Sequence, residues 1–218
     1  SKKIIKKIFV LSIGHNAQKI SFLLKQAGLI IIIGKFFDPY IVAYVSTTFT
    51  LFYYFPKRLF GRISNIYIFE FAHLFGKRNK ELLKTKLIFF LKYNLIFITI
   101  FSMFSIFLGP LIYEIWTNDN YQIIYLLFFL VIADSFIEVV KVSIFTIFKS
   151  LNNFIQLGVI DMFISSFGFI IFYLSLELEF LISFSSSYIF VALGNILVLI
   201  ISILMFYKFY KSNFKIHK

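Results

Sequence analysis

The sequence predicts an all-α integral membrane protein, with six transmembrane helices forming one lobe over residues 1–218 and both termini in the cytoplasm. The chain is 60% hydrophobic and 15% charged, with a mean hydropathy of +0.90, which is too apolar for an ordinary soluble domain. Several apolar runs are long enough for the roughly 20 residues that a helical span needs. Lysine and arginine gather between alternate runs, as expected for a multi-pass protein that follows the positive-inside bias.

The net charge of +12 does not indicate nucleic-acid binding, because the basic residues lie between apolar runs and form no soluble basic face. We expect them to contact anionic lipid headgroups at the cytoplasmic side. The absence of cysteine excludes a disulfide framework and thiolate chemistry. The sequence contains none of the common hydrolase, metalloprotease or nucleotide-binding motifs. We therefore predict that the chain is not an enzyme and has no cofactor or metal site.

The second helix, predicted over residues 39–75, is the element against which the others are oriented. Asp38 is a favourable N-cap residue and Pro39 suits the first helical turn. At 1.5 Å per residue the helix is on the order of 55 Å long, which exceeds the thickness of a bilayer. Either its last turns project into the cytoplasm or Pro56 kinks it. Gly76 is expected to end it, just before a dense basic loop.

Apolar runs and their breaks place the other spans. Gly109 and Pro110 are expected to end the third helix. Tyr113 and Trp116 would then lie in an irregular outer segment at the membrane interface, which aromatic residues prefer. The other predicted spans are residues 17–34, 82–108, 121–150, 154–176 and 183–210.

The loop charges orient the spans. With the N-terminus inside, Lys35 is the one cation expected in the outer segments. The inverted topology would place nearly every loop cation outside, against the positive-inside bias. The inner segments hold Lys2, Lys3, Lys6, Lys7, Lys77, Arg78, Lys80, Lys84, Lys86, Lys149, Lys211, Lys215 and Lys218. The outer segments hold Asp38, Glu114, Asp119, Glu177 and Glu179.

Five cations fall at membrane depth: Lys25, Lys57, Arg58, Arg62 and Lys92. A charge inside the bilayer costs several kcal/mol unless it meets a partner, water or the interface. The three on the second helix could extend to the inner headgroups, whereas Lys25 and Lys92 lie deeper. The functional interpretation of all five is a cationic, water-filled cavity that receives an anionic substrate such as a diphosphate.

Asp134, Glu138 and Lys141 recur at i, i+4 and i+7, which places them on one face of the fourth helix. Two interpretations stay open. The three residues form a self-neutralising stripe that docks this helix, or the acids form a pair that responds to protons or sodium, since close carboxylates favour protonation of one another. Asp161 on the fifth helix is a further candidate for the same cluster.

The run PKRLFGRISNIYIFEFAHLFGKRNKELLKTKLIFFLKYN, closed by FLGPLIYEIWTND, resembles the bacterial polysaccharide flippases. These are the Wzx-type O-antigen and teichoic-acid translocases of the multidrug/oligosaccharidyl-lipid/polysaccharide exporter superfamily. The likeness lies in a short loop before a leucine-rich helix start (residues 76–83), and in Gly109-Pro110 followed by Ile115-Trp116. Asn152 also fits. The chain departs from the family at residues 69–71, where Phe-Glu-Phe replaces a frequent Pro-Glu.

The resemblance implies alternating-access transport of an undecaprenyl-diphosphate-linked oligosaccharide across the bacterial cytoplasmic membrane. The membrane-depth cations would contact the substrate, and Asp134 and Glu138 would couple transport to ions. The family has two six-helix lobes, so we expect this chain to supply one lobe of a MATE-like transporter. The start at Ser1 and the basic lead-in suggest the C-terminal lobe. Its partner would then be the N-terminal lobe or another six-helix half.

Three other functions stay open. A small-molecule exporter of the same superfamily is the first, although exporters of cationic drugs favour acidic cavities. A polytopic membrane enzyme of the same polysaccharide pathway is the second, and it would need a His or acidic motif in a substantial loop. The third is a structural membrane subunit, in which the intramembrane charges would be contacts to a partner.

Overall fold

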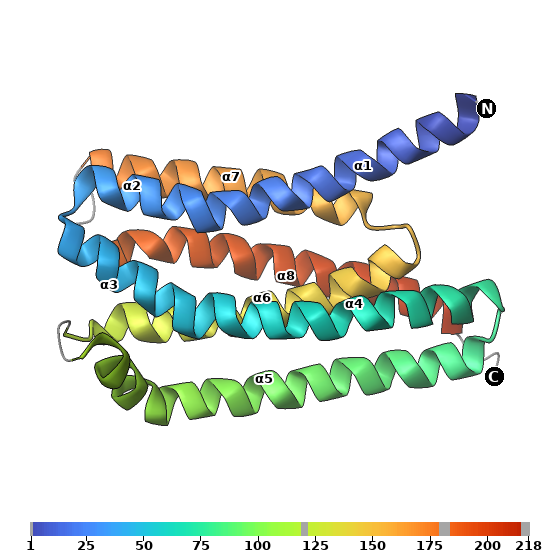
Figure 1. Ribbon diagram of the computed structural model, residues 1–218. Helices are drawn as coiled ribbons and strands as arrows, with labels where there is room; N and C mark the ends of the chain where they lie inside the picture. Colours follow the sequence, from blue (N-terminus) through green and yellow to red (C-terminus); the bar gives the residue numbers. More distant parts are fainter. Residues whose placement is uncertain (1, 119–121, 179–183, 215–218) are drawn as a thin grey trace.

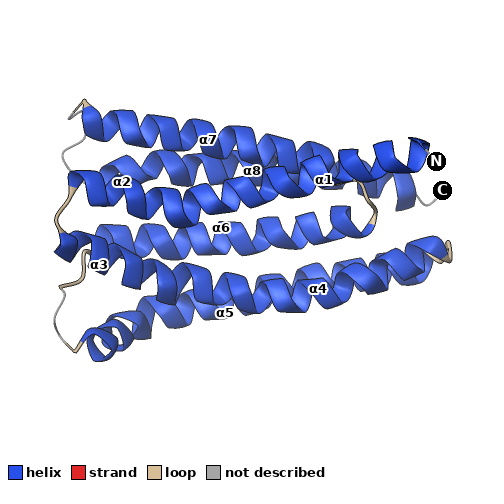
Figure 2. Cartoon of the chain, turned by 45° about the horizontal axis from the view of Figure 1, so that its top comes forward, coloured by secondary structure: helices blue, strands red, loops and turns tan. Residues whose placement is uncertain are grey.

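The computed structural model describes residues 2–118, 122–178 and 184–214, and within these ranges it contains helices and short connections but no strand (Figures 1 and 2). The prediction of an all-α fold is confirmed. Two π-helical segments, η1 and η2, join neighbouring α-helices end to end, so the described elements form six rods. The first rod is α1 (Lys2–Leu23), η1 (Leu24–Gly28) and α2 (Leu29–Phe36), and the second is α3 (Pro39–Phe49), η2 (Thr50–Tyr54) and α4 (Phe55–Gly76). The others are α5 (Lys80–Thr117), α6 (Tyr125–Ser150), α7 (Ile155–Glu177) and α8 (Phe184–Phe214).

Three of these helices, α5, α7 and α8, are long and apolar enough to cross a membrane. In α5 only 17% of the residues in the most apolar stretch are buried, so most of its apolar surface faces outward, where lipid would cover it. These features indicate a membrane protein. The other three rods contain a π-helical interruption or, in α6, three buried charged side chains. Six membrane spans are therefore a proposal that goes beyond the three apolar helices.

The predicted helix start at Asp38 and Pro39 is confirmed. Phe37 is extended, and the Asp38 carboxylate accepts a hydrogen bond of 2.9 Å from the Ile41 amide, which caps α3. Pro56 lies in the first turn of α4, directly after η2, where its missing N–H costs little. The second rod ends at Gly76, as predicted.

The prediction that Gly109 and Pro110 end the third helix is wrong. Helix α5 continues through both residues to Thr117, so Tyr113 and Trp116 are helical rather than part of an irregular segment. Figure 1 shows α5 bending near this end, as expected for a proline inside a helix. Close packing holds the bend, because a Cβ atom on Gly109 would lie 2.7 Å from the Phe128 ring.

The connections segregate to two ends of the bundle (Figure 1). The N-terminal end of α1, the α4–α5 turn, the α6–α7 turn and the C-terminal end of α8 share one end, which we call the basic end. The α2–α3 turn lies at the opposite end. Several predicted loop charges are not placed: Asp119, Glu179, Lys215 and Lys218 fall outside the described residues, as do the side chains of Lys2, Lys3, Lys6 and Lys7.

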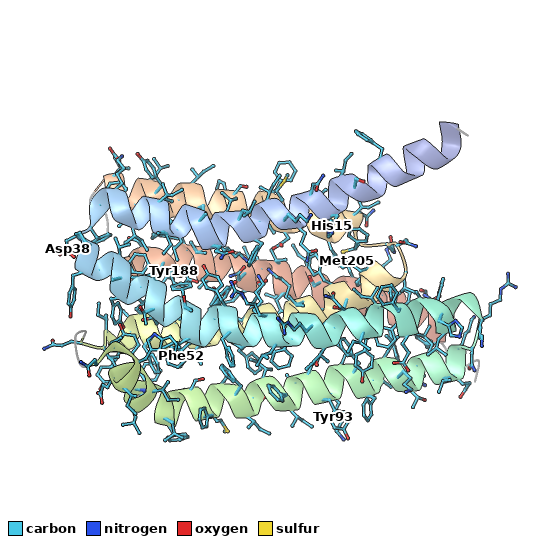
Figure 3. All side chains as sticks on the ribbon, viewed as in Figure 1. His15, Asp38, Phe52, Tyr93, Tyr188 and Met205 are labelled. Carbon is cyan, nitrogen blue, oxygen red and sulfur yellow. The ribbon has the colours of Figure 1, made fainter. Side chains whose placement is uncertain are left out.

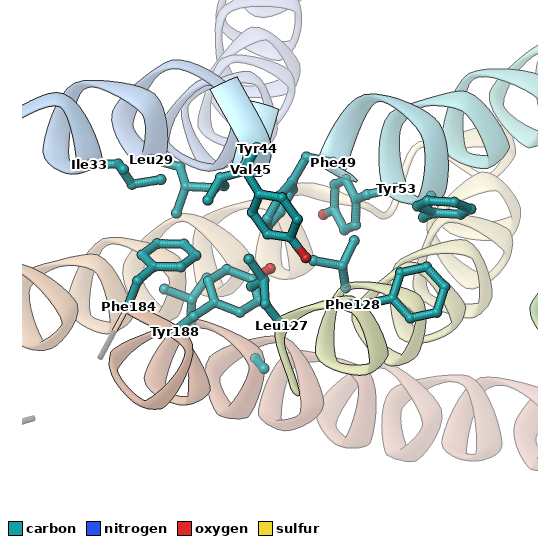
Figure 4. Close-up of a cluster of buried hydrophobic side chains, with 14 of the residues drawn as sticks. Leu29, Ile33, Tyr44, Val45, Phe49, Tyr53, Leu127, Phe128, Phe184 and Tyr188 are labelled. Carbon is teal, nitrogen blue, oxygen red and sulfur yellow. The ribbon is translucent and has the colours of Figure 1, made fainter. Parts of the chain in front are cut away.

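A cluster rich in aromatic residues, drawn in Figure 4, packs between the two π segments and the α2–α3 turn, in the half of the bundle away from the basic end. It joins the first two rods to α5, α6, α7 and α8. Its rings meet edge to face, with centroids 5.3 Å apart for Phe49 and Tyr188 and 5.0 Å apart for Phe52 and Phe128. Such pairs add to the stability gained by burial. We call this group of buried side chains the aromatic plug.

Candidate functional site

A cavity of about 320 Å³ lies between α1–η1 and α4, with α6 and Asp161 of α7 completing its wall. It exists because α1 docks along α7 and α4 docks along α6, which keeps α1 and α4 apart. Its deep end lies at the level of the two π segments, beside Lys25 and Tyr54. It extends toward the basic end, as far as His15 (labelled in Figure 3) and Lys149. Its charged lining comprises Lys19, Lys25, Lys57, Arg58, Lys149, Glu138 and Asp161.

The two π segments meet at the deep end of the cavity. The Tyr54 hydroxyl in η2 donates a hydrogen bond of 3.1 Å to the Lys25 carbonyl in η1. A π turn leaves the regular helical hydrogen-bond ladder incomplete, and such turns are frequent at functional sites. Lys25 itself is only 4% exposed, and its ammonium group donates to the Asn195 amide oxygen.

Glu138 lies at the centre of a buried ionic network. Its carboxylate contacts three ammonium groups, with N–O distances of 2.6 Å to Lys57, 2.7 Å to Lys141 and 3.5 Å to Lys25. Lys141 also pairs with Asp161 at 3.1 Å. Buried charges in a bilayer are tolerated when they are paired and hydrogen-bonded. The two carboxylates therefore offset two of the three lysine charges in the network, and the cavity lining stays net positive.

Asp134 is held differently from the other two acids. It accepts hydrogen bonds of 2.5 Å from the Tyr188 hydroxyl and 2.5 Å from the Asn195 amide. No salt bridge to Asp134 occurs among the described residues. Because Asn195 accepts from Lys25 and donates to Asp134, it links this carboxyl to the ionic network.

The structure brings together three of the five cations predicted for a cavity. Lys25, Lys57 and Arg58 line it. Arg62 and Lys92 do not, and both side chains are exposed. Arg62 projects from α4 beyond the edge of the stripe that faces the cavity, and Lys92 lies on α5, which does not border it. Depth along a helix does not give the rotation of that helix relative to its neighbours, so the sequence could not place these two side chains relative to the cavity.

The four residues predicted for ion coupling gather as expected. Asp134, Glu138 and Lys141 are all buried on α6, and Asp161 joins the cluster through Lys141. Of the proposed stripe of Asp134, Glu138 and Lys141, the last two form an ion pair, and Lys141 also pairs with Asp161 of α7. Within the described residues Asp134 has neutral donors, Tyr188 and Asn195, and no salt bridge balances its charge.

The sequence interpretation missed several residues of this site. Lys149 was predicted to lie in an inner segment, and His15 and Lys19 were given no role in a cavity, yet all three line it. Burial, followed by the charges of Lys149 and Lys19, lowers the pKa of His15, which precedes the first predicted span. Asn195 was also missed, although an isolated asparagine in an apolar helix is a detectable signal.

Comparisons with protein-family models, with curated proteins and with solved structures give no match to this chain. Among the described residues, no group of three or more His, Asp or Glu side chains is placed to hold a metal ion. The cavity, its charges and the aromatic plug are therefore the observations from which a function can be argued.

Proposed function

We propose that this chain is one six-helix half of a transporter that moves an anionic lipid-linked oligosaccharide across the bacterial cytoplasmic membrane. The observation that carries the proposal is the charge of the cavity, whose lining holds five Lys and Arg side chains against two carboxylates. A cleft with an excess of one sign and apolar walls concentrates ligands of the opposite sign. A diphosphate is such a ligand, and ammonium and guanidinium groups bind it through charge-assisted hydrogen bonds.

The positions of the cavity and the aromatic plug support transport by alternating access. The cavity extends from the π segments toward the basic end, whereas the plug fills the opposite half. This arrangement corresponds to an inward-facing state, if the basic end faces the cytoplasm as the positive-inside bias predicts. Outward release would then require the plug to open while the cavity closes.

The proposal includes a partner. The cavity lies at the side of one lobe, and the sequence resembles transporters that place two such lobes face to face. The partner would be the other lobe of the same protein or a second six-helix half. Anionic lipids would bind the basic end, where Lys77, Arg78 and Lys80 lie.

The other functions are less well supported by this site. An exporter of cationic drugs would need a predominantly acidic cavity, and the lining is predominantly basic. A membrane enzyme of the same polysaccharide pathway would bind the same lipid-linked diphosphate. It would release a chemically altered product, so analysis of the glycolipid after incubation with the purified protein distinguishes the two.

The experiment compares two arginines one helical turn apart. In the intact gene, expressed in a strain that lacks its own flippase, Arg58→Ala should lower surface glycan severalfold because Arg58 lines the cavity. Arg62→Ala is the matched control, with the same loss of charge outside the lining. Equal export by the two variants and the unaltered protein would contradict the proposal.

We assign ion coupling to Asp134, because Glu138 and Asp161 already have lysine partners. Transport measured against pH should change its profile in Asp134→Asn. An unchanged profile would leave Asp134 with only its structural role in holding Tyr188 and Asn195.

A further inference from the structure

The three lysines around Glu138 are not equivalent. The side chains of Lys25 and Lys141 are 5% and 2% exposed, and each has a second polar partner, Asn195 and Asp161 respectively. Lys57 is 17% exposed, and among the described residues its one carboxylate partner is Glu138. Lys57 therefore stands between the buried network and the open cavity.

The surroundings of Lys57 allow it to change partner. Its ammonium group lies 4.3 Å from the centre of the Phe22 ring and 5.6 Å from that of Tyr53. Aromatic faces stabilise a cation without fixing its direction. If Lys57 turns toward the cavity, Glu138 keeps the ammonium groups of Lys141 and Lys25 and is not left as an unpaired buried charge.

We propose that Glu138 pairs with Lys57 in the absence of ligand, and that an anionic group of the ligand displaces Glu138 from Lys57. The inference rests on the proposed function and deepens it by assigning a competitive, regulatory role to a carboxylate of the site. The contact between Lys57 and Glu138 joins α4 to α6 across the cavity wall. Ligand binding would break this cross-link and so make the packing of α4 on α6 depend on occupancy.

Because Glu138 and the ligand compete for Lys57, the proposal predicts the direction in which a substitution of Glu138 changes the affinity for an anion. Removing the charge of Glu138 frees Lys57 for the ligand, so affinity for an anion should rise rather than fall. A purely structural Glu138 predicts the opposite result, because loss of its carboxylate would leave the lysines disordered. The probe is inorganic pyrophosphate, titrated calorimetrically into the purified full chain in detergent.

Glu138→Gln should tighten pyrophosphate binding about tenfold, the equivalent of one charge-assisted hydrogen bond no longer in competition. Glu70→Gln is the matched control: it removes the same carboxylate charge from a Glu–Lys pair outside the cavity lining, 3.0 Å from Lys86, and should change affinity by less than about threefold. Adding Lys57→Met to Glu138→Gln should abolish the gain.

Affinity that is unchanged or weaker in a folded Glu138→Gln variant overturns the inference while leaving the cationic cavity in place. If neither the unaltered protein nor the variant binds pyrophosphate, the proposed function itself is overturned. Should Glu138→Gln fail to fold, Glu138→Asp keeps the charge and withdraws the carboxylate from Lys57 by one methylene. It should tighten binding about threefold, and no gain there overturns the inference equally.

Discussion

Gly158 of α7 lies against the backbone of Gly14 of α1, so that a Cβ atom at position 158 would be 2.5 Å from the Gly14 carbonyl oxygen. The reverse contact is equally tight, since a Cβ atom on Gly14 would lie 2.7 Å from the Ile155 Cα atom. Further along the same interface, Ser21 and Ser165 hydrogen-bond at 2.8 Å. Small residues let two helices approach this closely in a membrane. This crossing holds α1 on α7, away from α4, and so keeps the cavity open.

Gly158→Ala should therefore lower the free energy of unfolding by about 1–3 kcal/mol, because the new methyl group meets backbone that cannot rotate away. The measurement is thermal unfolding in detergent. Gly34→Ala is the control, since no heavy atom lies within 4 Å of the added Cβ there. It should leave stability unchanged or raise it by up to about 1 kcal/mol, because alanine favours helix. Equal melting of the two variants would contradict the close crossing.

For two adjacent tyrosines of η2, we expect substitution by phenylalanine to have opposite effects on stability. The Tyr54 hydroxyl bonds the Lys25 carbonyl, whereas the buried Tyr53 hydroxyl has no hydrogen-bond partner in the described part of the chain. Tyr54→Phe should destabilise the protein by about 1 kcal/mol through the lost hydrogen bond. Tyr53→Phe should be neutral or stabilising, because it removes an unsatisfied polar group. Chemical denaturation of both variants in one detergent tests this, and the reverse order would contradict the bond between the π segments.

His15 should report on anion binding. Burial and the charges of Lys149 and Lys19 lower its pKa, because they disfavour the protonated ring. An anion in the cavity offsets those positive charges and should raise the pKa of His15. By linkage, pyrophosphate should bind more tightly as pH falls through the pKa of His15.

An NMR titration of the imidazole resonances, assigned with His15→Gln, measures this shift with and without pyrophosphate. The resonance of His73, which does not line the cavity, serves as the internal control. A fall in the pKa of His15, or no change at saturating pyrophosphate, would contradict an anion site between Lys19 and Lys149.

The six-span topology can be tested directly because the chain has no cysteine. Lys35→Cys, at the α2–α3 end, should react with a membrane-impermeant maleimide applied to intact spheroplasts. Lys77→Cys and Asn152→Cys, at the basic end, should react only after permeabilisation. Reaction of all three from one side would exclude the proposed topology, and the inverted pattern would reverse its orientation.

Sequence reasoning succeeded where local chemistry decides the outcome. The Asp38 cap, the proline start at Pro39 and the stop at Gly76 depend on one or two neighbouring residues, and the structure confirms them. It was wrong at Gly109 and Pro110, where packing against Phe128 carries a bent helix past two residues that weaken helices. Hydropathy also gave no sign of η1 and η2, because a π turn changes the helical phase and leaves composition unaltered.

The sequence by itself determined that the chain is helical and apolar, and which charged residues fall within its apolar runs. A charged residue in the middle of an apolar run can be recognised from the order of residues alone. Only the tertiary structure decided which of those charges meet. It placed Lys57 and Arg58 at the cavity and left Arg62 and Lys92 outside it, and it put Asn195 between Lys25 and Asp134. The physical reason is that partnership between buried charges depends on the rotation and docking of whole helices, which arise from contacts between residues distant in the sequence.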